Sequence, residues 1–130
     1  MSVTLVQPDR LHDTQKVGYS HAFLAAGRLL FVSGQVALDG QGRLVGPGDV
    51  EAQTVQAFEN LRVVLEEAGA GFSDLARLNV YITDPRFTEP YRRIRRRYLR
   101  EPFPASTLVV VAGLADPDWL IEIEAVAAID

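Results

Sequence analysis

Cysteine is absent from this chain of 130 residues, which excludes disulfide bonds, thiolate nucleophiles and zinc–thiolate sites. Histidine occurs only at His12 and His21, and neither has the acid–histidine spacing of a metal site. No apolar run approaches the ~18 residues that a membrane helix requires, and the opening MSVTLVQPDR lacks the pattern of a secretory signal. We therefore expect a cytoplasmic protein without a membrane segment or a metal site.

Familiar phosphate-binding and nucleophile motifs are also missing. The glycines between positions 40 and 48 form neither a dinucleotide fingerprint nor a P-loop. Ser33 lies in Val-Ser-Gly-Gln, which is not the elbow of a serine hydrolase. The net charge of −4 argues against a general attraction to nucleic acid. The glycine-rich stretch is accordingly interpreted as a hairpin tip and linker.

The apolar patterns predict a single domain of residues 1–130. Phe58, Leu61 and Leu65 recur at helical spacing, which predicts a helix over about 49–68 with Asp49 as its N-cap. A second helix is expected from Thr88 to the prolines at 102 and 104. Strands are expected at 3–6, 17–25, 29–34, 75–83, 108–112 and 119–129, with 17–25 and 29–34 paired as a hairpin and the last two as neighbours.

This order of elements predicts an α+β fold. One mixed, mainly antiparallel sheet would carry both helices on one face. Its other face would then expose valine, isoleucine and leucine side chains, so we expect the protein to oligomerise.

Two local clusters of charge allow more than one interpretation. In the last predicted strand, Glu122 and Glu124 share one face. They either face solvent or pair with arginines, or one of them orients water and moves a proton in a pocket. The run Arg92–Arg100 holds six arginines, which form either a solvated helix face or a surface for anions or RNA.

Several segments occur in a fixed order: Gly18-Tyr19-Ser20, Leu30-Phe31-Val32-Ser33-Gly34-Gln35, Asn60-Leu61, Ala68-Gly69-Ala70, Val80-Tyr81-Ile82-Thr83-Asp84, Phe103-Pro104-Ala105 and Ile121-Glu122-Ile123-Glu124-Ala125. From about residue 17 to 127 the chain thereby resembles the RidA (YjgF-like) family of reactive-intermediate deaminases, also catalogued as L-PSP endoribonucleases. The resemblance implies a chorismate-mutase-like fold, a homotrimer with ligand clefts between subunits, and hydrolysis of small 2-imino acids without a metal or organic cofactor.

The same resemblance implies roles for individual residues. Glu122 would be the catalytic acid that places the attacking water. Tyr19 and Tyr91 would line the cleft, with small polar contacts to the substrate from Ser33, Gly34, Ser106 and Thr107. Tyr91 occupies a helix position that is often asparagine in such deaminases.

One departure bears directly on the substrate. The deaminases have an arginine after the Pro-Ala pair that clamps the substrate carboxylate, whereas Pro104-Ala105 is followed here by Ser106. Ser106 and Thr107 supply only hydroxyl groups. A sheltered arginine–carboxylate contact contributes roughly 1.5–3 kcal/mol, so its loss would weaken carboxylate binding about tenfold to a few hundredfold.

Three functions remain open at this point. The leading hypothesis is a hydrolase, similar to the 2-iminobutanoate/2-iminopropanoate deaminases, that acts on a small imine or enamine in an intersubunit cleft. The second is a non-catalytic trimer that senses a small ligand or binds a partner. The third is an RNA-directed activity that uses the arginine-rich helix.

Overall fold

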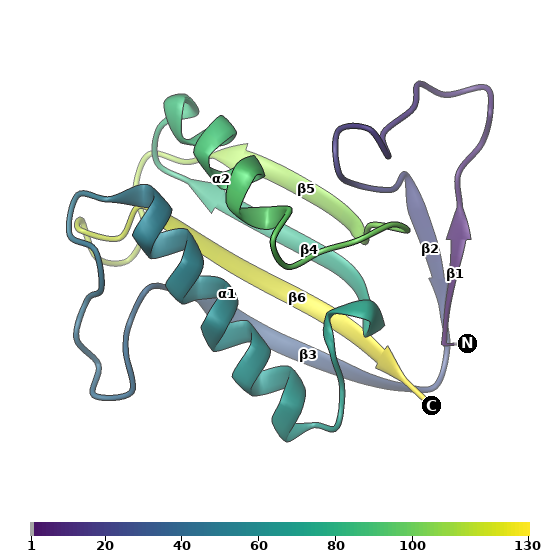
Figure 1. Ribbon diagram of the computed structural model, residues 1–130, viewed down its shortest axis with the longest axis horizontal. Coiled ribbons are helices and arrows are strands. Elements are labelled where there is room, and N and C mark those ends of the chain that lie inside the picture. Colours follow the sequence, from purple (N-terminus) through teal and green to yellow (C-terminus); the bar gives the residue numbers. More distant parts are fainter. Residues whose placement is uncertain (1) are drawn as a thin grey trace.

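Four strands form a mixed sheet in the order β3–β6–β4–β5 in the computed structural model, which describes residues 2–130 (Figure 1). The strands are β3 (Arg28–Gln35), β4 (Leu75–Ile82), β5 (Ala105–Val110) and β6 (Ile121–Ile129). β6 pairs antiparallel with β3 and with β4, while β4 and β5 are parallel. The predicted mixed, mainly antiparallel sheet is confirmed.

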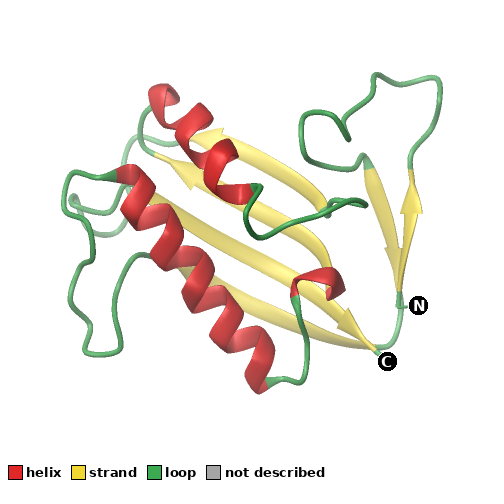
Figure 2. Ribbon diagram, viewed as in Figure 1, coloured by secondary structure: helices red, strands yellow, loops and turns green. Residues whose placement is uncertain are grey.

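Both helices, α1 (Val50–Glu67) and α2 (Thr88–Arg95), cover the same face of this sheet (Figure 2). The carboxylate of Asp49 accepts a hydrogen bond from the backbone N–H of Ala52 at 3.1 Å, as expected of an N-cap. Phe58, Leu61 and Leu65 of α1 are fully buried against the sheet. Each buried side chain of this size contributes about 1.5–3 kcal/mol to folding.

The sheet strands alternate as the sequence predicts. Leu78, Val80 and Ile82 of β4 are fully buried beneath the helices. On β6, Ile121, Ile123 and Ala125 are also buried, so Glu122 and Glu124 lie on the opposite, uncovered face.

The second helix is shorter than predicted, because α2 ends at Arg95. Beyond it the N–H groups of Arg97 and Tyr98 bond to carbonyls three residues back, at 2.9 and 3.0 Å. This tighter turn brings Leu99 into the core. Pro102 follows, and a proline disfavours helical backbone in the residue before it.

The predicted hairpin between residues 17–25 and 29–34 is wrong. β2 is restricted to Ala22–Ala25 and pairs with β1 (Val3–Val6) in a separate two-stranded sheet. Gly27, with φ of +96°, turns the chain, and the N–H of Ala26 bonds to the carbonyl of Ser2 at 2.8 Å, which extends the β1–β2 ladder. This ribbon lies beside one end of the four-stranded sheet (Figure 1), where Val3 packs against Ala76 and Ala128.

The last two strands are not neighbours, contrary to the prediction, because β4 lies between them. β5 also begins earlier than expected, at Ala105, and β6 begins at Ile121. The N–H of Val111 bonds to Ile82 at 2.8 Å and the N–H of Thr83 bonds to Leu120 at 3.2 Å. The segment 111–120 therefore passes around the end of β4, with one strand on each of its edges.

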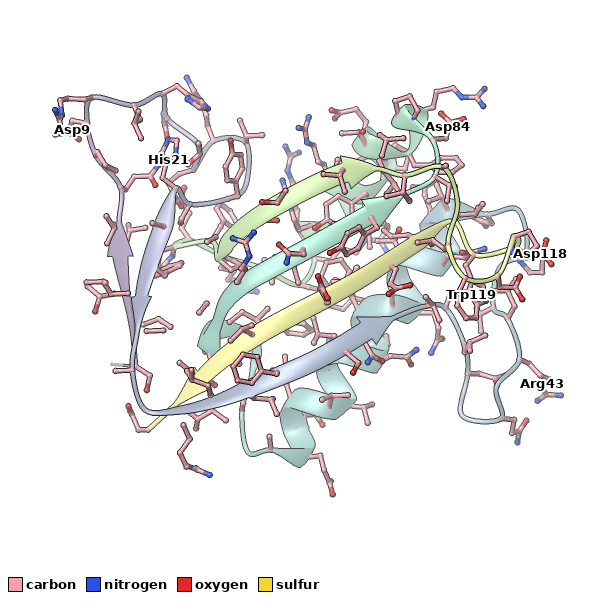
Figure 3. The ribbon with its side chains drawn as sticks, turned by 180° about the vertical axis from the view of Figure 1, so that it is seen from behind. Asp9, His21, Arg43, Asp84, Asp118 and Trp119 are labelled. Carbon is pink, nitrogen blue, oxygen red and sulfur yellow. The ribbon has the colours of Figure 1, made fainter. Side chains whose placement is uncertain are left out.

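The face opposite the helices is uncovered by any element of residues 2–130, as Figure 3 shows. Phe31 on this face is 73% exposed and Leu29 is 49% exposed. Within the described part of the chain, no helix is long and apolar enough to cross a membrane.

Candidate functional site

The two acids of β6 have different surroundings on the uncovered face. The carboxylate of Glu124 accepts hydrogen bonds from Asn79 Nδ2 at 3.2 Å and from the hydroxyl of Tyr81. The bond to Glu124 is also the main cause that raises the pKa of Tyr81. No side chain in residues 2–130 donates a hydrogen bond to Glu122. Glu124 is thus held in place by its neighbours, whereas the carboxylate of Glu122 is available.

Gly34 lies directly against Glu122. The β3–β6 register shifts between Val32 and Gln35, which places Ser33 and Gly34 at an irregularity of the strand. A Cβ atom at position 34 would lie 2.6 Å from Cδ and 2.8 Å from Cγ of Glu122. The sequence uses glycine here because any side chain would displace this carboxylate.

An open hollow of about 320 Å³ lies on the uncovered face. Ser33 and Phe31 line it from β3, Arg77 and Asn79 from β4, and Glu124 from β6. Ser33 is the predicted site residue that lines this hollow, and Gly34, the next residue of the chain, contacts Glu122.

The remaining predicted residues lie along β5. Ser106 is paired with Leu78, so its side chain points to the helix layer. Thr107 points to the uncovered face, where Arg77 Nη2 donates a hydrogen bond to its hydroxyl at 3.2 Å. The two hydroxyl-bearing neighbours thus face opposite sides of the sheet.

Tyr19 belongs to a turn that packs against the start of β5. The N–H groups of Val17, Gly18 and Tyr19 all bond to the carbonyl of Thr14, at 3.0–3.2 Å. The next residue, Ser20, forms an isolated bridge with Ala105 and donates its N–H to Pro104 at 3.1 Å. Tyr19 therefore lies beside β5. It precedes Ser20, which pairs with Ala105, and Ala105 precedes Ser106.

Tyr91 lies in the core rather than at an open surface. Its side chain is fully buried and stacks on Phe58 with a centroid distance of 6.1 Å. Burial raises the pKa of Tyr91 to about 12. Its hydroxyl has no hydrogen-bond partner among the described residues.

The site residues therefore fall into two groups at different edges of the sheet. Ser33 and Gly34 are on β3 with Glu122 on the adjacent β6, while Tyr19 and Ser106 lie at β5. β3 and β5 are separated by three strand spacings, roughly 14 Å. A single subunit does not bring these two groups into one cluster.

Three of the six arginines between Arg92 and Arg100 are either paired with an acid or buried. Arg92 pairs with Glu89 at 2.8 Å and Arg93 pairs with Glu51 at 3.2 Å. Arg95 is buried next to Gly18 and the ring of Tyr91. Sequence reasoning missed Arg95 as a separate residue. Its spacing of four from Tyr91 was the available signal, because residues four apart share a helix face.

No group of three or more histidine, aspartate or glutamate side chains that could hold a metal ion occurs within residues 2–130. The chemistry available at Glu122 is that of a carboxylate, which binds water and accepts or returns a proton.

Comparison with known proteins agrees with this architecture. The family described as Endoribonuclease L-PSP matches residues 12–129. A RutC family protein from Pyrococcus abyssi is 36% identical over 84% of each chain. A 2-iminobutanoate/2-iminopropanoate deaminase from Dermatophagoides farinae is 28% identical over 96% of this chain and 100% of its own.

Solved structures show the same relationship. The Rid-family protein YyfB from Yersinia pestis, described as of unknown function, has a TM-score of 0.93 and 36% identity over 99% of this chain and 100% of its own. RidA from an Antarctic Psychrobacter has a TM-score of 0.74 and 32% identity over 85% of this chain and 88% of its own. The fold, the matched residues and these relatives show that the chain belongs to the RidA (YjgF-like), or endoribonuclease L-PSP, family.

Proposed function

We propose that this protein hydrolyses a small imine or enamine metabolite in a cleft between the subunits of a homotrimer. The observation that carries the proposal is the contrast between the two acids of β6. Glu124 is bonded to Asn79 and Tyr81, whereas Glu122 lies against Gly34 with its carboxylate unbonded in the described chain. The deaminase name of the Dermatophagoides relative supports the reaction class.

The reaction needs little machinery. A water molecule attacks the imine carbon while Glu122 takes a proton from that water. Glu122 returns this proton to the nitrogen, which leaves a carbon that bears a hydroxyl and an amino group. Glu122 then takes the proton of that hydroxyl and passes it to the nitrogen, so that the carbon–nitrogen bond breaks and a carbonyl product and ammonia leave. A positioned general base of this kind accelerates a reaction by about 10²–10⁴-fold.

The division of the site residues supports a cleft between subunits. If the β5 edge of one subunit meets the β3–β6 edge of the next, Tyr19 and Ser106 of the first approach Glu122 of the second. The exposed Phe31 and Leu29 on the uncovered face are apolar surface that such an assembly would bury.

The test is ammonia release from imino acids that are generated enzymatically in the assay. Wild-type protein is compared with Glu122→Ala, Glu122→Gln and Ser106→Arg. We expect both Glu122 variants to lose activity and Ser106→Arg to gain activity on substrates that carry a carboxylate. Full activity in Glu122→Ala would show that the catalytic assignment is wrong. Ligand-dependent stabilisation of the wild type without any turnover would instead support a ligand-sensing trimer.

A further inference from the structure

Arg95 is a buried cation without a counterion among residues 2–130. Its side chain is 5% exposed, and no carboxylate of residues 2–130 lies within 4 Å of it. Nη2 donates to the carbonyl of Val17, while Nε has no hydrogen-bond partner in the described chain. Burying a charge is costly unless it is paired, so this arrangement calls for an anionic partner.

Neighbouring arginines show that this isolation is specific to Arg95. Arg86 is paired with Asp84 at 2.6 Å, and Arg92 and Arg93 are paired with Glu89 and Glu51. The remaining arginines of the segment, Arg96, Arg97 and Arg100, are exposed to solvent. Only Arg95 combines deep burial with the lack of an acid within reach among residues 2–130.

Tyr91 adds a second unused donor on the same face of α2. It precedes Arg95 by one helical turn, and the guanidinium carbon lies 5.3 Å from the centre of its ring. The hydroxyl of Tyr91 is buried and, like Nε of Arg95, has no hydrogen-bond partner in the part of the chain that the structure describes. Because burial raises the pKa of Tyr91 to about 12, this hydroxyl remains protonated and can donate to an anion.

The residues around Arg95 and Tyr91 place these donors near the turn that leads to Tyr19 and pairs with the start of β5. The guanidinium lies against Gly18, where a Cβ atom would be 2.8 Å from its central carbon. Gly18 has φ of +110° and precedes Tyr19 and Ser20, and Ser20 bridges to Ala105, the residue before Ser106. Ser106 also points toward the helix layer that contains α2. Arg95 thus lies on the same side of the sheet as Ser106, against the turn whose following residue pairs with the start of β5.

We propose that Arg95 and the hydroxyl of Tyr91 bind the carboxylate of a small organic acid, which replaces the Val17 carbonyl as the acceptor for Nη2. A planar carboxylate suits a guanidinium because it accepts two parallel hydrogen bonds. Entry requires the turn of residues 14–19 to move outward, and Gly18 places no side chain in the way. The inference deepens the proposed function by naming a charged group of its substrate, and it rests on that function only for assigning Arg95 to the cleft.

The test measures the affinity of the purified protein for 2-oxobutanoate by calorimetry, with uncharged butan-2-one as the matched probe. We expect wild type to bind 2-oxobutanoate and not butan-2-one. Arg95→Met should weaken binding about tenfold to a hundredfold, and Tyr91→Phe should weaken it several-fold. Arg93→Met, which removes an exposed arginine paired with Glu51, is the control and should leave the affinity unchanged.

The outcomes separate this inference from the proposed function. If 2-oxobutanoate binding depends on Arg95 but wild type releases no ammonia from imino acids, the inference stands and the proposed function fails. If ammonia is released and Arg95→Met has an unchanged Kd and KM, the inference fails and the function stands. Absence of 2-oxobutanoate binding to wild type also overturns the inference. If Arg95→Met does not fold, Arg95→Lys serves, since it keeps the charge but loses the planar fork and should still bind more weakly.

Discussion

Replacing Gly34 by alanine would move the Glu122 carboxylate without removing it. This variant therefore tests whether catalysis depends on where that carboxylate lies. The new Cβ would lie 2.6 Å from Cδ of Glu122. Since carbon atoms pack at about 3.5–4.0 Å, the carboxyl group must withdraw by at least roughly 1 Å. A displacement of that size at a catalytic group costs about 10²-fold in rate. We therefore expect kcat/KM for ammonia release to fall by about two orders of magnitude, or about 2.7 kcal/mol of transition-state stabilisation.

The fold should tolerate the same change. Gly34 does not have a positive φ, so alanine meets no backbone strain there. Moving the half-buried Glu122 side chain off its rotamer costs about 0.5–1.5 kcal/mol. Alanine also restricts the unfolded chain more than glycine does, which stabilises the folded state by about 0.4–1 kcal/mol. The free energy of unfolding, measured with urea, should change by less than about 1 kcal/mol. Gly113→Ala is the matched control, because nothing lies within 4 Å of a Cβ atom at that position.

A double-mutant cycle completes the test. If Gly34→Ala acts only through Glu122, it should cause little further loss in a Glu122→Gln background. Wild-type kcat/KM in the Gly34→Ala single mutant would refute the reasoning. Equal losses in the wild-type and Glu122→Gln backgrounds would show that Gly34 serves the site in some other way.

Three further outcomes can be checked. Phe31→Asp should convert the expected trimer to monomers in light scattering, because it places a charge on apolar surface that the assembly would bury; an unchanged mass would refute this interface. Tyr81→Phe should lower the free energy of unfolding by about 1 kcal/mol, since Glu124 loses one of its two donors. Burial and the Glu59 carboxylate raise the pKa of Tyr98 from 10.0 to about 12, so the protonated form is favoured in the folded state. That stabilisation is complete below pH 10 and should be lost as the pH rises toward 12, and Tyr98→Phe should flatten this part of the pH profile.

The site could be predicted only in part, for a geometric reason. Gly34 and Glu122 meet because β3 and β6 are paired, and a strand pairing between residues 88 positions apart is not visible in local patterns. The separation of Ser106 from Thr107 by face follows once their strand is fixed. The spacing of four residues places Arg95 on the same helix face as Tyr91, but its burial depends on how the turn of residues 14–19 packs against α2, which the sequence does not show.

The amino-acid sequence by itself determined those features that depend on residues close together in the chain. The apolar spacing of Phe58, Leu61 and Leu65 with the cap at Asp49 specified α1, and the alternation along β4 and β6 specified which face each side chain takes. Tertiary structure alone decided that β4 separates β5 from β6 and that β2 pairs with β1. These choices depend on long-range packing and backbone hydrogen bonds, for which several apolar strands of similar length are equally suitable partners in sequence.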